Sequence, residues 1–374
     1  QADSASSILV IRSNFWPLRQ RRRQEAYRLT MSHPVRTAFA SDNYAGVHPQ
    51  ILQALVDANV GHATSYGEDP WTGRFEELAR RLFGVQAQAW PVFNGTGANV
   101  VALQAVLPRW GGVIAAQSAH INNDEGGAPE KVGGLKIMPV PTPDGKLTPD
   151  LVAEQAWGYG DPHRVQPLAV SISQVSELGT CYTPEEVAAL ANFCHERGLA
   201  LHMDGSRLSN AAAYLGADFK DFTTRCGVDI LSLGATKNGA MGAEAVVVLD
   251  PSRVDGVEYL RKTDMQLGSK MRFISAQLIA MYETDLWLNS ARHANEMARY
   301  LRECLGDFVE VAQPVQSNVV FARLTKRQKE RARRQFKFYD WPGEPGLVRL
   351  MCSFDTTAGD VEALAQVIRE AAPA

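Results

Sequence analysis

A lysine at the end of an apolar run is the first candidate for chemistry in this sequence. Residues 231–240 read Leu-Ser-Leu-Gly-Ala-Thr-Lys-Asn-Gly-Ala, so Lys237 follows a run typical of a buried strand and precedes a flexible glycine. A second apolar run, Glu244 to Leu249, predicts a return strand. An amine held at such a junction is well placed to act as a nucleophile. On this segment alone, a surface lysine in a hairpin is an equally good interpretation.

A turn rich in small residues lies upstream. The strand expected at residues 89–93 leads into Asn94-Gly95-Thr96-Gly97-Ala98-Asn99, and an apolar helix follows. Free backbone N–H groups at the start of a helix suit a phosphate. The segment lacks the lysine of a nucleotide-binding P-loop and the glycine spacing of a dinucleotide site, and a tight structural turn remains the alternative.

A histidine and an aspartate also follow predicted strands. His120 comes after the apolar run at residues 113–116, and Asp204 ends the run that begins at Leu199. A lone loop histidine is usually solvated, but open α/β sheets bind ligands at the carboxyl ends of their strands. A carboxylate in a buried position needs a cationic partner, for which Arg207 and a bound cofactor are both candidates.

These four features together match the needs of one cofactor, pyridoxal 5′-phosphate. Lys237 would bind its aldehyde, Asp204 would keep its ring nitrogen protonated, and the turn over residues 94–99, which contains Gly95 and Thr96, would offer donors for its phosphate. The imidazole of His120 would lie over the ring.

Composition points to a small-molecule partner. The 374 residues carry a formal net charge of −3, and such a charge does not favour binding to nucleic acid or to an anionic membrane. No apolar run is long enough to span a bilayer. The five cysteines are scattered without metal-type spacing, so we expect no metal site and reduced thiols in a cytoplasmic protein.

Alternating strand and helix patterns predict an α/β fold with a large, mostly parallel sheet. One helix is well marked, with Thr183 as N-cap, Glu186 completing a capping box and Gly198 after its end. We predict a large domain over residues 37–275 and a small C-terminal α+β domain over residues 276–374. Residues 1–36 are Arg-rich and are expected to be a disordered extension.

From Phe39 to the C-terminus the sequence resembles the low-specificity L-threonine aldolases, pyridoxal enzymes of the aspartate-aminotransferase-like fold (fold type I). The resemblance rests on four motifs: Ser41-Asp42-Asn43, Phe93-Asn94-Gly95-Thr96-Gly97-Ala98-Asn99, His202-Met203-Asp204-Gly205-Ser206-Arg207 and Gly234-Ala235-Thr236-Lys237-Asn238-Gly239. It implies the cofactor roles given above, with Arg207 near the cofactor hydroxyl and within reach of the substrate. It also implies that Ser41 and Arg349 grip the substrate carboxylate.

The same resemblance implies a homotetramer in which Tyr66 and Arg272 act across an interface between subunits. The implied reaction is retro-aldol cleavage of L-threonine, L-allo-threonine or phenylserine-like amino acids to glycine and an aldehyde. Many members carry a histidine in the loop that here reads Gln174-Val175-Ser176-Glu177, so the group that deprotonates the β-hydroxyl is left open. Another pyridoxal lyase, a transaminase and a non-catalytic binding protein are the alternatives.

Overall fold

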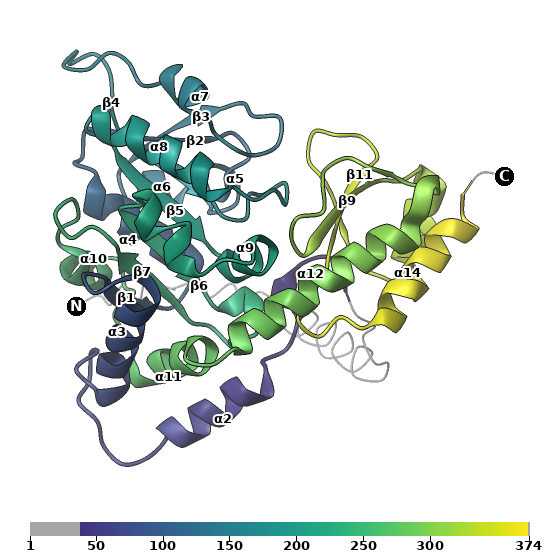
Figure 1. The fold of residues 1–374 in the computed structure, drawn as a ribbon, viewed down its shortest axis with the longest axis horizontal. Coiled ribbons are helices and arrows are strands. Elements are labelled where there is room, and N and C mark those ends of the chain that lie inside the picture. The colour runs from purple at the N-terminus through teal and green to yellow at the C-terminus, as the bar shows by residue number, and fades with distance from the viewer. Residues whose placement is uncertain (1–37, 373–374) are drawn as a thin grey trace, which may run out of the picture.

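The structure, a computed structural model, describes residues 38–372. The extension expected at residues 1–36 lies outside the described residues. Two sheets organise the chain, a seven-stranded sheet in the larger part and a four-stranded sheet in the smaller part (Figure 1). This arrangement confirms the predicted α/β class with a small C-terminal α+β region.

The large sheet has the order β1-β7-β6-β5-β4-β2-β3. Only β7 runs antiparallel to its neighbours, and the other pairings are parallel. Four strands, β2, β5, β6 and β7, are buried along their whole length, so the sheet is covered on both faces. The strands are β1 (Gln88–Val92), β2 (Gly111–Ala116), β3 (Lys136–Val140), β4 (Gln166–Ser173), β5 (Ala200–Gly205), β6 (Ile230–Gly234) and β7 (Glu244–Val248).

The helices of this part cover the sheet, and five of them begin at a side chain that accepts a hydrogen bond from the first helical turn. The predicted capping box is confirmed, because Thr183 and Glu186 bond each other's backbone N–H at the start of α8. The helix α3 begins at Pro70, because the Asp69 side chain caps it. The helices are α2 (Pro49–Ala58), α3 (Pro70–Phe83), α4 (Gly95–Val106), α5 (His120–Asn123), α6 (Ala128–Lys131), α7 (Pro149–Ala153), α8 (Pro184–Glu196), α9 (Leu208–Leu215), α10 (Val257–Thr263) and α11 (Arg272–Tyr282).

The smaller part packs helices against an antiparallel sheet of order β10-β11-β9-β8. Its core includes Phe39, which bonds the backbone of Lys337 and Met351, so the first described residues run alongside β11. The helix α12 lies between the two parts, packed on α9 on one side and α14 on the other (Figure 1). The elements are α12 (Leu286–Leu305), β8 (Glu310–Val311), β9 (Val319–Arg323), α13 (Lys326–Arg333), β10 (Tyr339–Asp340), β11 (Leu347–Met351) and α14 (Ala358–Glu370).

The predicted division at residue 275 stays a prediction. Apolar residues up to Leu286 belong to the core of the large part, whereas the core of the small part takes Phe39 and buried residues from Ala298 onward. Residue 275 itself lies within α11, and α12 follows it.

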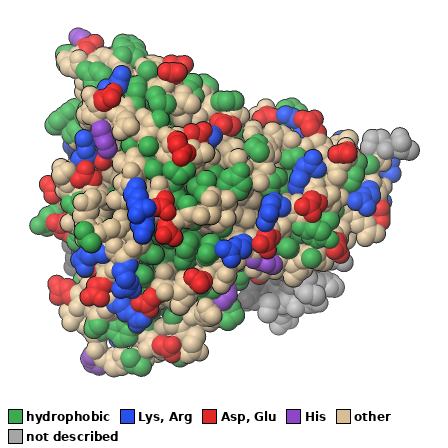
Figure 2. Space-filling view, in the orientation of Figure 1, with side chains coloured by type: hydrophobic (Ala, Val, Ile, Leu, Met, Phe, Trp, Pro, Cys, Tyr) green, Lys and Arg blue, Asp and Glu red, His purple; other side chains and the backbone are tan. Residues whose placement is uncertain are grey.

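The surface carries both signs of charge. Figure 2 shows Lys and Arg side chains interspersed with Asp and Glu over one face, as the small net charge leads us to expect. Within residues 38–372, no helix combines the length and apolar character needed to cross a membrane. The five cysteines are free thiols, and four of them are buried.

Candidate active site

Candidate residues from four parts of the chain follow strands of the large sheet. Asp204 lies near the end of β5, and Lys237 lies in the short helix η4 (Thr236–Asn238), just after the neighbouring strand β6. His120 opens α5 after β2, and Gly95 opens α4 after β1. Since these strands run in one direction, the residues that follow them lie toward the same edge of the sheet, where open α/β folds bind ligands.

The turn before α4 offers donors for an anion. Asn94 caps the helix by accepting a hydrogen bond from Gly97 N at 2.7 Å, and the N–H groups of the first helical turn have no acceptors within the helix. The hydroxyl of Ser206 lies close by, since a Cβ added to Gly95 would stand 3.7 Å from its Oγ. Backbone N–H groups, a hydroxyl and a helix N-terminus form a donor set that fits a phosphate group.

Gln266 covers the same turn from another part of the chain. Its Oε1 accepts a hydrogen bond from Phe93 N at 3.1 Å. A Cβ on Gly97 would collide with the Gln266 side chain, so the close approach of the two segments requires a glycine.

Asp204 is a buried carboxylate that stays charged. It is 5% exposed, and its two oxygens accept hydrogen bonds from Asn99 Nδ2 and Ser206 N, both at 2.9 Å. Burial raises the pKa of Asp204, but the Lys237 charge and the bond from Ser206 outweigh it and hold the pKa at about 2. A stably ionised carboxylate at this place fits a cationic ring nitrogen.

Lys237 has the electrostatic setting of a reactive amine. Burial lowers the pKa of its amine, and the Arg207 charge lowers it further, while Asp42 and Asp204 act in the opposite direction. Gly239, with φ of 112°, turns the chain away directly after it. A larger fraction of neutral amine favours attack on an aldehyde.

Two carboxylates hold His120. Its Nδ1 lies 2.8 Å from Glu125 Oε1, and its backbone N–H donates to Glu177 Oε1 at 2.8 Å. Burial lowers the pKa of His120, but the hydrogen bond to Glu125 and the charge of Asp204 produce a net rise. Burial raises the pKa of Glu177.

Arg207 pairs with Asp42 rather than with Asp204. Its Nε and one terminal nitrogen donate to the two Asp42 oxygens at 2.8 and 3.0 Å, and Asn318 donates to the same carboxylate at 3.1 Å. This bidentate pair is buried. Of the two partners considered for Asp204 from sequence, Arg207 is therefore bonded elsewhere, and the cation that most lowers the pKa of Asp204 is Lys237.

Ser41 and Arg349 come together although they lie at opposite ends of the chain. Ser41 is the N-cap of the short helix η1 (Asp42–Tyr44), and Arg349 on β11 donates to the carbonyl of the preceding residue, Ala40, at 3.2 Å. The Arg349 Nε is buried and has no partner within residues 38–372. A guanidinium with an unused buried donor beside a hydroxyl fits a carboxylate.

Tyr66 and Arg272 lie apart from this group. Tyr66 bonds Ser269 O through its backbone and has Lys262 over its ring, and Arg272 bonds the carbonyls of Val60 and Gly61. Tyr66 is 49% exposed and has a left-handed φ of 61°, which is uncommon for a tyrosine. Within the part of the chain that the structure describes, no hydrogen bond or ring contact joins either residue to Lys237, Asp204 or Arg349.

Sequence reasoning did not assign roles to several residues that contact the candidate site. These residues are Asp42, Asn99, Glu125, Glu177, Ser206, Gln266 and Asn318. For five of them the only sequence signal is membership of the quoted motifs or of polar loops that follow strands, which does not identify a partner. Gln266 follows the helix α10 and Asn318 precedes β9, so these two carry no such signal.

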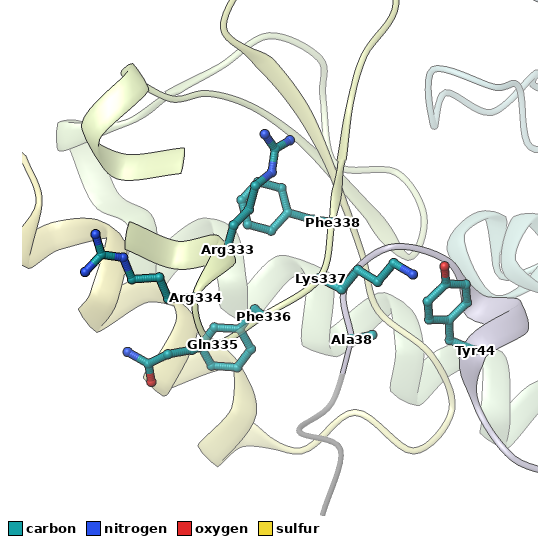
Figure 3. A pocket seen from close by; sticks show the side chains of 8 residues that line it. All are labelled: Ala38, Tyr44, Arg333, Arg334, Gln335, Phe336, Lys337 and Phe338. Carbon is teal, nitrogen blue, oxygen red and sulfur yellow. The ribbon is translucent and has the colours of Figure 1, made fainter. Parts of the chain in front are cut away.

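A separate hollow lies on the small part of the molecule. It is lined by Ala38, Tyr44 and the segment 333–338, and Figure 3 shows Arg333, Arg334 and Lys337 around it. None of the candidate site residues lines it.

Known proteins resemble this chain along most of its length. The beta-eliminating lyase family matches residues 38–326. A low-specificity L-threonine aldolase of Pseudomonas aeruginosa is 41% identical over 88% of this chain and 96% of its own, and one from Saccharomyces cerevisiae is 25% identical over 76% and 73%. The solved structure of Leishmania major threonine aldolase superposes with a TM-score of 0.84 at 29% identity, covering 89% of this chain and 98% of that one.

Proposed function

Because the chain belongs to the low-specificity L-threonine aldolases within the beta-eliminating lyase family, we propose that it cleaves L-threonine and L-allo-threonine to glycine and acetaldehyde with pyridoxal 5′-phosphate. The single observation that carries this proposal is the neighbourhood of Asp204 and Lys237, a carboxylate with a pKa of about 2 beside an amine with a lowered pKa. Phenylserine-like amino acids are further candidate substrates.

The cofactor, when bound, supplies an electron sink for the bond that breaks at the α-carbon of the substrate. Lys237 would hold its aldehyde, Asp204 its ring nitrogen, and Gly95, Thr96 and Ser206 its phosphate. The ring of His120 would stack on it. The donors at the turn before α4 support the phosphate assignment, and the pKa shifts of Asp204 and Lys237 support theirs.

The substrate carboxylate would bind Arg349 and Ser41. The unpartnered Nε of Arg349 supports this assignment. A fixed carboxylate sets the rotation of the substrate about its α-carbon, so this contact selects the Cα–Cβ bond for cleavage. Arg207, held by Asp42, would stand near the cofactor hydroxyl as a fixed positive charge.

We also propose a homotetramer in which Tyr66 and Arg272 reach the site of a neighbouring subunit. The exposed, left-handed Tyr66 supports this, since such a backbone conformation costs about 1–3 kcal/mol and is retained where function needs it. Mixing inactive Lys237→Ala and Tyr66→Ala subunits would restore activity if the two residues serve one site from different chains. No restoration after verified subunit exchange would contradict this arrangement.

Two measurements test the main proposal. Borohydride should abolish the absorption band of the bound cofactor and fix the cofactor covalently to the protein. A peptide map should then find the cofactor label on Lys237. Glycine and acetaldehyde should form from L-threonine in equal amounts, with L-alanine and a keto acid acceptor as controls. A label on another lysine would refute the site, and amino transfer to the keto acid without aldehyde would refute the reaction.

A further inference from the structure

A chain of hydrogen bonds runs from Asp204 to the ring of His120. Asn99 Nδ2 donates to Asp204 Oδ2 at 2.9 Å and to Glu125 Oε1 at 2.8 Å. The same Glu125 oxygen lies 2.8 Å from His120 Nδ1. The side chain of Glu125 is 0% exposed, and that of His120 is 37% exposed. The two ends of this chain are residues assigned above to the cofactor ring, and its two middle residues have no assigned role.

We propose that Glu125 is a positioning residue that fixes the ring of His120, holding a proton on Nδ1 and leaving Nε2 as the atom that gains or loses a proton. The role of His120 in turnover rests on the proposed function, whereas its pairing with Glu125 belongs to the chain itself.

The chemistry of the pair supports this assignment. An ionised carboxylate only accepts hydrogen bonds, so at 2.8 Å the Nδ1 atom must be the donor and carry the proton. The neutral ring then has its lone pair on Nε2. A carboxylate that orients a histidine in this way also stabilises the imidazolium that forms when Nε2 takes up a proton.

Glu125 has no competing structural role in the described residues. Within residues 38–372 its side-chain hydrogen bonds go only to Asn99 and His120, and its second carboxylate oxygen is buried without a partner. No lysine or arginine within residues 38–372 pairs with it. A buried, half-satisfied carboxylate is costly, and the only ring nitrogen that it bonds in the described part of the chain is that of His120.

Four charged groups from four elements act on His120. Glu125 follows α5, Asp204 lies on β5, Lys237 lies in η4, and Glu177 in the loop after β4 bonds the His120 backbone. Glu125 and Asp204 raise the pKa of the imidazole, whereas burial and Lys237 lower it. Among the residues that the structure describes, only Glu125 makes a hydrogen bond to the ring, so its loss is expected to have the largest effect.

The test compares the proton affinity of His120 in Glu125→Gln and wild type. The glutamine side chain keeps an oxygen that accepts from Asn99 and from Nδ1–H, so the shape of the site is retained and the charge is lost. Diethyl pyrocarbonate acylates the neutral imidazole, and mass spectrometry of the peptide containing His120 gives the modification rate against pH. We measure it on the full-length protein with and without cofactor. The midpoint, which is the pH at which the modification rate of His120 reaches half its maximum, should fall by about one pH unit in the variant.

Two further variants control for nonspecific effects. Glu177→Gln replaces a carboxyl that bonds the His120 backbone and the Ser173 hydroxyl but makes no hydrogen bond to the His120 ring, and it should leave the midpoint close to that of wild type. Glu125→Asp keeps the charge and should restore most of the wild-type midpoint. Equal midpoints for wild type and Glu125→Gln, or an equal fall in Glu177→Gln, would overturn the proposal.

A measurement on the wild-type protein needs no variant to fold. In the native protein, the pH midpoint of His120 modification should be higher than the midpoint of the same residue after unfolding in guanidinium. A native midpoint at or below the unfolded midpoint would overturn the proposal. These readouts do not use turnover. A normal midpoint difference without aldehyde release would therefore refute the proposed function and leave the role of Glu125 intact, and aldehyde release without the difference would do the reverse.

Discussion

Replacing Asp204 by asparagine tests the electrostatic reasoning most directly. The substitution keeps the shape of the side chain and removes the charge. The site lowers the pKa of Asp204 from 3.8 to about 2, which at 1.36 kcal/mol for each tenfold change in proton affinity is about 2 kcal/mol in favour of the negative charge. A cation held by that charge loses a comparable amount in the variant. We therefore expect kcat/KM for L-threonine cleavage to fall by roughly thirtyfold or more with cofactor still bound.

The assay is aldehyde release, with the cofactor content of each preparation measured by absorbance. Asp229→Asn is the matched control, because Asp229 is also buried but pairs with His195 and the backbone of Leu201. It should reduce stability and leave turnover per folded enzyme unchanged. A kcat/KM for cofactor-loaded Asp204→Asn within threefold of wild type would refute the reasoning.

The stability of the same variant has a defined pH dependence. A depressed carboxyl pKa stabilises the fold above pH 3.8, and the contribution is lost as the pH falls toward about 2. The stability of Asp204→Asn should therefore fall less steeply than that of wild type as the pH is lowered from 3.8 toward 2, as measured by acid unfolding followed by circular dichroism.

Three other changes have definite expected outcomes. Arg349→Ala should raise KM and lower kcat together, by roughly a hundredfold in kcat/KM, since the substrate is no longer oriented; an unchanged kcat in steady-state assays would argue against the carboxylate contact. Asp42→Asn should cost about 3 kcal/mol in urea unfolding, because Arg207 is left in a buried site without its counter-charge, and an unchanged midpoint would contradict this. Burial raises the pKa of Glu244 from 4.5 to about 7, so between these two pH values the folded state binds more protons than the unfolded state and stability falls as the pH rises. Glu244→Gln should remove this fall of stability with pH. The same fall in urea unfolding of the variant would show that another group causes it.

The local sequence determined where strands and helices form and which strand ends carry the candidate site residues. The apolar run before Lys237 and the one that ends at Asp204 form neighbouring strands, because burial on both faces of a sheet needs continuous apolar segments. The alternation of such runs with capped helices was enough to predict the α/β class. The Thr183 capping box was also predictable from local sequence, because its two partners lie only three residues apart.

The partners of the charged residues were decided by tertiary structure. Arg207 was considered as a partner of Asp204, its near neighbour in sequence, but it bonds Asp42, 165 residues away. Glu125 and Asn99 reach each other only because α4 and the segment after α5 pack at one edge of the sheet. A sequence pattern records which residues are buried along one element, whereas the contact between two elements depends on strand order and helix packing. The network around His120 could therefore be found only from the folded chain.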